Sequence, residues 1–212
     1  MKTFLVANPK GGSGKSTLAT HLAAYFAHAG QQVMLGDIDR QHSAREWLAS
    51  RPAHLPAIAT WDIGHDHIAR PPRGASHVVL DTPAGLRGKM LDKVLKLSAR
   101  VIVPVQPSVF DMRATRVFLD ALLAEKAVRK GRADVAVIGM RVDPRTRAAA
   151  ARLRATPSAT CWAERSALAA TSSMVVESSS MLLAMRCAAS AWWAGRWRTR
   201  RPRSARPTSR RR

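Results

Sequence analysis

A chain of 212 residues, 46% of them hydrophobic, is long enough for one α/β domain with a substantial core and too short for a second full domain. No stretch approaches the roughly 18 consecutive apolar residues of a membrane span, and the N-terminus enters a strand-like run without a leader. We therefore expect a cytoplasmic protein without stable membrane insertion. Cys161 and Cys187 fit neither a metal motif nor a disulfide framework.

The net charge of +21 is unevenly spread along the chain. Residues 1–154 hold 24 of the 35 Lys and Arg and 12 of the 14 Asp and Glu, which gives +12, whereas residues 155–212 hold 11 and 2, which gives +9. A large positive charge is typical of proteins that bind nucleic acid. Because the net positive charge per residue is about twice as high in the last quarter of the chain, the two parts differ in character.

The first motif is a glycine-rich loop, residues 8–17, with the sequence NPKGGSGKST. A strand-like run over 3–7 precedes it, and apolar residues at helical spacing follow from Ser16 to a stop at Gly30. The glycines allow successive N–H groups to turn onto phosphate at the positive end of a helix. Lys15 would bind the β- and γ-phosphates, and Ser16 would contact Mg²⁺. The predicted cofactor-binding residues are Gly11, Gly12, Ser13, Gly14, Lys15, Ser16 and Thr17.

This loop departs from the general pattern G-x-x-x-x-G-K-[ST], because Pro9 stands where the first glycine would be. The string KGGSGKST, with Lys10 before the glycines, resembles the deviant loop of the ParA/MinD class of P-loop ATPases. The resemblance implies ATP and Mg²⁺ as cofactors. It also implies that Lys10 reaches across an ATP-dependent homodimer to the phosphates bound by the partner subunit.

Two carboxylates, Asp37 and Asp39, follow the second predicted strand, residues 32–36. Ligands of a parallel sheet lie outside the carboxyl ends of its strands, so both carboxylates can face the same phosphates. The segment resembles the family's first switch, in which Asp37 would support Mg²⁺ and Asp39 would position or activate the attacking water. Three residues depart from the family pattern: Gly36 replaces an apolar residue, Arg40 a proline and His42 a glycine.

The segment that follows carries no strong motif. We expect a helix over 43–51, a loop over 52–56, a weak strand over 57–61 and a short helix from Asp62 to Ala69 that ends before the turn at 70–74. His65 and His67 bracket Asp66, but without further ligands at suitable spacing they are more typical of a polar surface than of a metal site.

A third motif completes the predicted nucleotide site. The apolar run over 77–81 predicts a buried strand that ends in Asp81, and the string DTPAGL includes this residue. An aspartate at such a strand tip can order Mg²⁺ through water, and Gly85 allows the next loop to respond to the γ-phosphate. The string closely resembles ParA-type partition ATPases, and it is third in the family's order.

Two more strands are expected, over 100–105 and 134–141, with a helix over 111–126 between them. The turn at 106–108 has the family's VPVQPS form. Strands alternating with helices predict an α/β fold, a doubly wound and mainly parallel sheet with helices on both faces and the nucleotide at the strand tips. By resemblance, residues 142–147 lie near the adenine and lead into a helix whose basic residues contact DNA.

Beyond about residue 154 the amino-acid alphabet narrows. No Asp, Asn, His, Lys, Gln, Tyr, Ile or Phe occurs in residues 155–212. The first six share adenine at the second codon position, so we hypothesise that this tail is translated out of frame from a GC-rich gene. The alternatives are a disordered basic tail and a membrane-surface or nucleic-acid segment built on Trp192, Trp193 and Trp197, although Pro202 and Pro207 interrupt any long helix. The predicted division is an ATPase domain at 1–154 and an atypical tail at 155–212.

The resemblance covers residues 1–153 and implies a ParA-type ATPase in plasmid or chromosome segregation. Such a protein dimerises on ATP, binds DNA without sequence preference at the nucleoid, and leaves it on hydrolysis stimulated by a centromere-binding adaptor. Two alternatives remain, a MinD-like ATPase that cycles on membranes and an inactive remnant of incomplete fold. The catalytic residues would be Lys10, Lys15 and Asp39, and the residues that support the metal Ser16, Asp37 and Asp81.

Overall fold

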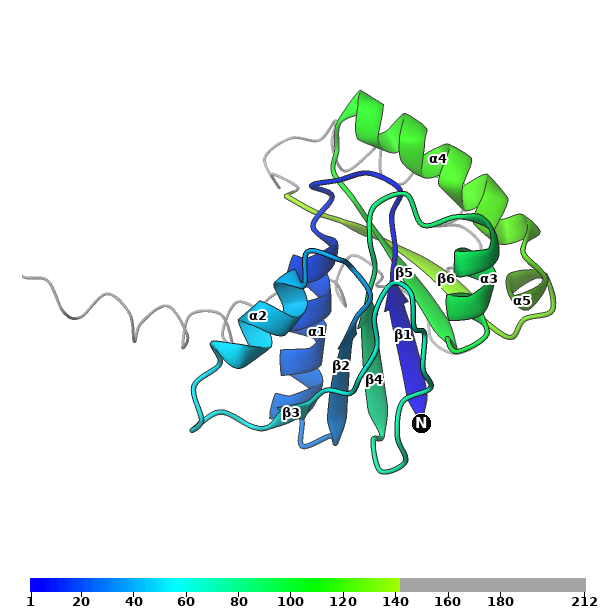
Figure 1. Ribbon diagram of the computed structural model, residues 1–212. Coiled ribbons are helices and arrows are strands. Elements are labelled where there is room, and N and C mark those ends of the chain that lie inside the picture. The colour runs from blue at the N-terminus through cyan, green and yellow to red at the C-terminus, as the bar shows by residue number, and fades with distance from the viewer. Residues whose placement is uncertain (142–212) are drawn as a thin grey trace, which may run out of the picture.

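A sheet of six parallel strands forms the centre of the structure, a computed structural model that describes residues 1–141. The spatial order is β3-β2-β4-β1-β5-β6, and every neighbouring pair is parallel (Figure 1). The doubly wound parallel sheet predicted from the sequence is thereby confirmed. The strands are β1 Lys2–Val6, β2 Val33–Asp37, β3 Ile58–Ala59, β4 His77–Asp81, β5 Arg100–Val105 and β6 Asp134–Gly139.

Helices cover both faces of this sheet, α1 and α2 on one and α3, α4 and α5 on the other (Figure 1). Alternate residues of β1 face the two layers: Phe4 and Val6 belong to the cluster under α1, whereas Leu5 belongs to the cluster under α3 and α4. The helices are α1 Lys15–His28, α2 Ser43–Ala49, α3 Gly88–Leu95, α4 Val109–Ala124 and α5 Lys126–Arg129.

The register of the central strands brings the predicted site together. In the β1–β4 pair Val6 lies opposite Asp81, and in the β2–β4 pair Asp37 lies opposite Asp81. The chain leaves β1 toward β2 on one side, and after β4 it crosses to β5 on the other. The glycine-rich loop and both aspartates therefore meet at the carboxyl edge, where the winding of the sheet reverses.

The helix expected over residues 62–69 is absent, so that prediction was wrong. Trp61 and Ile63 are both buried with an exposed residue between them, which is the pattern of an extended chain. The indole N–H of Trp61 donates to the carbonyl of Ala69 at 3.3 Å, and Gly64 N donates to His67 O at 2.9 Å across a bend at residues 65–66. Burial of the two apolar side chains decides the conformation here.

The long helix after β5 also differs in its ends from the expected 111–126. It begins at Val109, because the Ser108 hydroxyl oxygen caps it by accepting from the backbone N–H of Asp111 at 3.1 Å. It ends at Ala124, because Glu125 adopts an extended conformation, and the short α5 follows. The expectations for residues 142–147 and for the tail at 155–212, including the frame hypothesis, lie outside the described residues.

Gly36 is required by the packing of Trp61 against the sheet. A Cβ at position 36 would lie 2.5 Å from Cη2 of Trp61 and 2.9 Å from Cδ2 of Leu80. The indole therefore fills the space that an apolar strand residue occupies in the family pattern. The glycine at position 36, one of the three departures from that pattern, thus has a structural reason.

Gly36→Ala should lower the free energy of unfolding by about 1 to 3 kcal/mol, because the added methyl group forces the indole or Leu80 to move. Gly64→Ala is the matched control, since no atom lies within 4 Å of a Cβ built there. Urea denaturation of the nucleotide-free protein measures both variants. Equal stability of the two would show that Trp61 does not occupy this position.

Candidate functional site

The glycine-rich loop joins β1 to α1 and has the conformation of an anion cradle. Gly12 and Gly14 have positive φ angles of 74° and 92°, and Gly14 is the N-cap residue of α1. A Cβ at Gly11 or Gly12 would meet no atom within 4 Å, so the loop is open at these positions. At Gly14 a Cβ would lie 2.9 Å from Cε of Met140, which closes the loop on the β6 side. The open side adjoins the positive end of α1.

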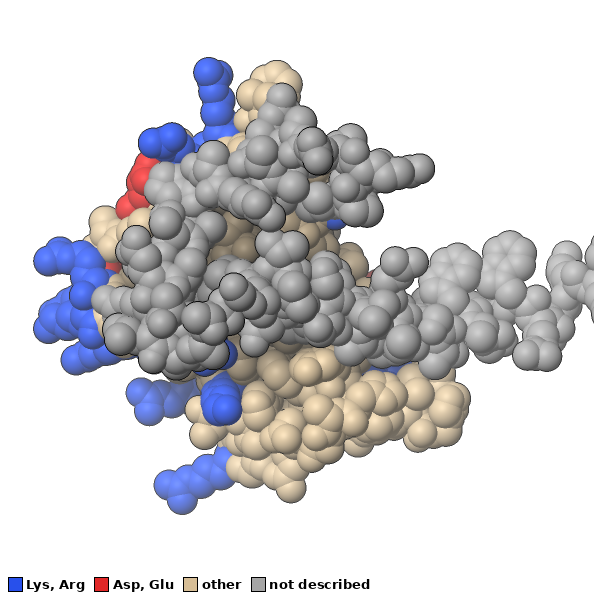
Figure 2. Space-filling model, turned by 180° about the vertical axis from the view of Figure 1, so that it is seen from behind, with Lys and Arg blue, Asp and Glu red and all other residues tan. Residues whose placement is uncertain are grey.

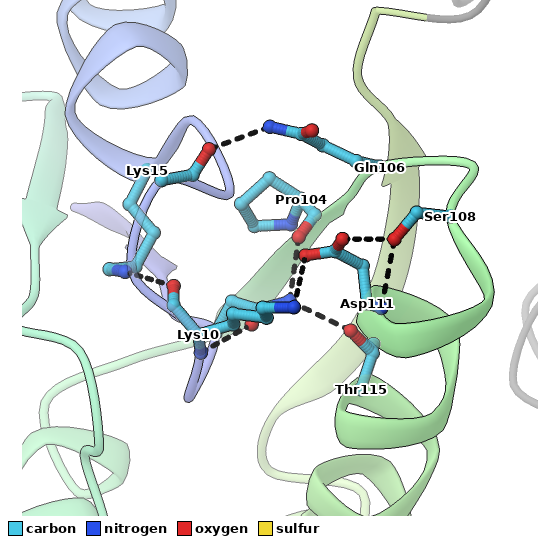
Figure 3. Close-up of polar contacts among 9 residues, drawn as sticks. Lys10, Lys15, Pro104, Gln106, Ser108, Asp111 and Thr115 are labelled. Atoms are coloured by element: carbon cyan, nitrogen blue, oxygen red, sulfur yellow. Dashed lines mark hydrogen bonds and ion pairs between the residues drawn. The ribbon is translucent and has the colours of Figure 1, made fainter.

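The two lysines of the loop point to different places (Figure 3). The Nζ atom of Lys15 donates to the carbonyl oxygen of Lys10 at 3.0 Å, and this side chain is buried. Burial lowers the pKa of Lys15, and the nearby carboxylates of Asp81 and Asp39 oppose that shift. The Nζ atom of Lys10 instead lies 3.6 Å from Oδ1 of Asp111 on α4. Only Lys15 therefore belongs to the buried part of the site.

Asp81 is a buried carboxylate without a partner among the described residues. Its residue is 0% exposed, and neither carboxylate oxygen accepts a hydrogen bond from this part of the chain. The pKa of Asp81 is raised to about 6, chiefly by desolvation. The nearby Ser16 hydroxyl lowers the pKa, the negative charge of Asp37 raises it, and the positive charge of Lys15 lowers it. A buried anion in this state is a strong acceptor for a cation or for ordered water.

Asp37 and Asp39 follow the same strand but have different surroundings. The Asp37 carboxylate is buried and accepts from three backbone N–H groups, those of Asp39, Ala44 and Arg45, at 2.9 to 3.0 Å. It thereby fixes the first switch to the start of α2, a role that the sequence analysis missed. Asp39 is half-buried, and its Oδ1 accepts from the backbone N–H of Gln41 at 3.1 Å. It is the more accessible of the two.

Hydrogen bonds to residues far along the chain hold the glycine-rich loop in place, and the sequence analysis missed them too. Asn8 is buried; its amide donates to Pro104 O at 2.7 Å and to Thr115 Oγ1 at 3.0 Å, and its Oδ1 accepts from Lys10 N at 2.8 Å. Gln106 donates to Gly12 O at 2.6 Å (Figure 3). The available signal was a polar residue at the end of an apolar strand.

The loop after β4 is also tied to the glycine-rich loop. The Thr82 hydroxyl donates to Val6 O at 2.8 Å, and Gly85 N donates to Pro9 O at 2.9 Å. Gly85 has a φ of 75°, which suits glycine. The segment predicted to respond to the γ-phosphate is therefore hydrogen-bonded to the segment predicted to bind it.

These residues fit a magnesium–nucleotide complex. The buried Ser13 hydroxyl has no partner among the described residues, like the Asp81 carboxylate, and both belong to the site around the open loop. Ser16 is half-buried and Thr17 exposed on the first turn of α1. Within residues 1–141 no three His, Cys, Asp or Glu side chains form a metal cluster. A magnesium ion bound with a nucleotide would take part of its shell from phosphate oxygens. Such an ion would neutralise Asp81.

The raised pKa of Asp81 predicts how stability depends on pH. The protonated Asp81 carboxyl contributes fully to the free energy of unfolding below its ordinary pKa of 3.8. This contribution is lost as the pH rises through the raised pKa of about 6. Between about pH 4 and pH 7.5, in EDTA and without nucleotide, the wild type should lose about 2 kcal/mol of unfolding free energy relative to Asp81→Asn. Urea denaturation across this range measures the difference. Asp62→Asn, at an exposed aspartate, is the matched control; parallel profiles for wild type and Asp81→Asn would contradict the assignment.

Comparison with known proteins gives consistent matches. The family described as the CobQ/CobB/MinD/ParA nucleotide binding domain matches residues 4–160. Maintenance of carboxysome distribution protein A of Gloeobacter kilaueensis is 32% identical over 154 residues, 68% of this chain and 65% of the relative. Protein ParA of Rhizobium radiobacter is 26% identical over 152 residues, 69% and 68% of the two chains. The chain thus spans about two thirds of the length of these relatives.

Solved structures agree on the fold. Cobyrinic acid a,c-diamide synthase from Mycobacterium smegmatis, with bound ADP and magnesium, has a TM-score of 0.62 at 19% identity, covering 92% of this chain and 97% of that one. The pNOB8 ParA bound to nonspecific DNA has a TM-score of 0.53 at 16% identity, covering 70% of each chain. None of the helices within residues 1–141 has the length and apolar character that a membrane span requires.

Proposed function

This chain belongs to the CobQ/CobB/MinD/ParA nucleotide-binding family, and from that premise we propose that it is a partition ATPase that dimerises on ATP and binds DNA without sequence preference. The expected relation to ParA/MinD ATPases is confirmed by the family match and by the ParA relative. The observation that carries the proposal is the buried Asp81 carboxylate, which has no hydrogen-bond partner among the described residues and lies close to Lys15 of the glycine-rich loop.

The roles of the site residues follow from their surroundings. In the proposed site the loop N–H groups and Lys15 bind the phosphates, and Ser16 and Asp81 hold Mg²⁺, which neutralises charge on the phosphates when bound. Asp37 supports the metal indirectly, because its carboxylate already fixes the first switch. Asp39 is accessible and close enough to influence Lys15, which suits a residue that orients the attacking water.

Lys10 has the position needed for a role between subunits. Its side chain is 40% exposed and points toward Asp111, away from the Lys15 ammonium group. A lysine that does not serve its own phosphates is available to those of a second copy. The proposed active form is therefore a homodimer, with one Lys10 completing each partner's site.

A basic surface supports DNA as the substrate of the ATP-bound form. Lys and Arg side chains project along the left edge of Figure 2 with few acidic ones between them, on the side where α3, α4 and α5 lie in Figure 1. Within residues 126–132, four of the seven are exposed basic residues, namely Lys126, Arg129, Lys130 and Arg132. Such a surface binds phosphate backbones without reading sequence.

The proposed setting is the cytoplasm, at the nucleoid when ATP is bound, with a centromere-binding adaptor that stimulates hydrolysis. A carboxysome-distribution relative at 32% identity favours a second candidate, the same ATP cycle used to position a protein assembly in place of a replicon. The two candidates share nucleotide chemistry and the DNA surface and differ only in adaptor and cargo.

The central test is nucleotide-dependent DNA binding. With ATP and Mg²⁺ the protein should bind random duplex DNA, with affinity falling steeply as salt increases. Lys15→Ala should weaken ATP binding by roughly 10- to 100-fold, because the phosphates lose a charged partner. At an ATP concentration that saturates only the wild type, this variant should therefore not bind DNA. Lys2→Ala, at an exposed lysine outside the site, is the control.

Filter binding and calorimetry measure the two affinities. ATP-dependent binding to anionic vesicles in place of DNA would favour the MinD-like alternative. ATP binding without binding to DNA or vesicles, in a protein that shows no cooperative thermal melting with ATP and Mg²⁺, would favour the inactive remnant of incomplete fold.

Lys10→Ala should separate the role between subunits from local phosphate binding. ATP affinity in dilute protein should change little, because Lys15 and the loop N–H groups remain. Dimerisation with a non-hydrolysable ATP analogue should weaken at least tenfold, since each interface loses a cation at the partner's phosphates. Analytical ultracentrifugation measures this, again with Lys2→Ala as the control. An unchanged dimer would refute the intersubunit role.

A further inference from the structure

The Lys10 ammonium group lies at the N-terminus of α4. Its Nζ atom is 3.6 Å from Oδ1 of Asp111, in the first turn of that helix (Figure 3). The positive end of a helix repels an ammonium group, so the helix alone would disfavour this position. The Asp111 carboxylate is the feature that makes it favourable. Lys10 is therefore where it is because of one side chain on a different element.

Asp111 is itself held in place. Its side chain is 14% exposed, and Oδ2 accepts a hydrogen bond from the Ser108 hydroxyl. The Ser108 oxygen in turn accepts from Asp111 N at 3.1 Å, which makes a reciprocal cap. One carboxylate oxygen is thus committed to the cap, and the other faces Lys10. A carboxylate fixed in this way offers the lysine a defined anchoring point.

The backbone of Lys10 is anchored independently of that contact. Its N–H donates to Asn8 Oδ1 at 2.8 Å, and its carbonyl accepts from Lys15 Nζ at 3.0 Å. Asn8 is fixed in turn to β5 and α4 through Pro104 and Thr115. With the main chain held, the long side chain is the variable part. Asp111 is the one charged group among the described residues that pairs with it.

We propose that Asp111 is a positioning residue for Lys10. It holds the ammonium group extended from the loop, toward a second copy of the chain, before that copy arrives. An ammonium group has three donors, so contact with one carboxylate oxygen leaves others for phosphate. Ordering the side chain in advance lowers the entropy cost of the contact between subunits. This inference rests on the proposed ATP-dependent dimer and names a residue that regulates how readily it forms.

The opposite role would be restraint. If Lys10 had to leave Asp111 to reach the phosphates, the ion pair would oppose dimerisation, and its removal would make the dimer tighter. A half-exposed pair at 3.6 Å is weak, and one ammonium group can contact both anions. Positioning is therefore the favoured role, and the two predict effects of opposite sign.

Asp111→Asn tests the proposal, because asparagine keeps the shape and the acceptor for Ser108 but removes the charge. The dimer formed with a non-hydrolysable ATP analogue and Mg²⁺ should be roughly 2- to 30-fold weaker, from two pairs of ordinary exposed strength, while ATP affinity in dilute protein stays unchanged. Asp120→Asn, an exposed aspartate on the same helix, is the matched control. A dimer of unchanged or greater affinity would overturn the proposal.

A double-mutant cycle shows whether Asp111 acts through Lys10. In the Lys10→Ala background, Asp111→Asn should have no further effect on dimerisation, whereas a purely structural role at the cap would persist there. Thermal melting of each variant reports damage to the cap separately. An additive loss in the double variant would assign Asp111 to the helix and not to Lys10.

A measurement on the nucleotide-free protein keeps this inference separate from the proposed function. NMR relaxation of the Lys10 Cε methylene, identified by its loss in Lys10→Arg, should show a more ordered side chain in the wild type than in Asp111→Asn. Ordering without any ATP-dependent dimer would refute the proposed function and leave the positioning role in place. Equal mobility in the two proteins would refute the positioning role itself.

Discussion

The site depends on one unfavourable burial, that of the Asp81 carboxylate. Strand β4 places it between β1 and β2, where the carboxylate is fully buried and the described residues supply no hydrogen bond. Its pKa of about 6 reflects that cost. Lys15 is also buried against its ordinary preference for the charged form, so two desolvated groups of opposite charge lie in the same site. Two such groups stabilise the empty site only moderately, and a ligand that carries both a cation and a phosphate should add the most stability to it.

The departures of the first switch from the family pattern have different physical accounts. Gly36 makes room for the Trp61 indole. His42 has a φ of 51°, a left-handed conformation that favours glycine, so the side chain is tolerated at a cost of about 1 to 2 kcal/mol. The Asp37 carboxylate compensates, because it accepts the N–H groups at the start of α2 that His42 leaves without a side-chain cap. Arg40 instead contacts half-buried His65 and exposed Asp66, and such a surface contact adds little stability.

The sequence predicted those parts of the fold and site that local patterns determine. Apolar runs located the long strands, and three motifs located Lys15, Asp37 and Asp81, because strand tips in a parallel sheet share one edge. Contacts between distant segments were not predictable in this way. Nothing in the local sequence indicates that Asn8 bonds to Thr115 or that Lys10 pairs with Asp111, since these contacts depend on where α4 packs. The false helix at 62–69 failed for the same reason, because burial of Trp61 and Ile63 overrode a local capping signal.

These long-range contacts give the glycine-rich loop two mechanical connections. On one side Gly85 donates to Pro9, and on the other Gln106 and Asn8 connect the loop to the turn before α4 and to α4 itself. A shift of the loop on binding phosphate must therefore alter hydrogen bonds to both the loop after β4 and α4. Lys10 follows Pro9 in the chain, and both its backbone N–H, through Asn8, and its side chain, through Asp111, are linked to α4. The residue proposed to complete the partner's site thus directly follows the residue that accepts from Gly85, and is itself part of the connection to α4.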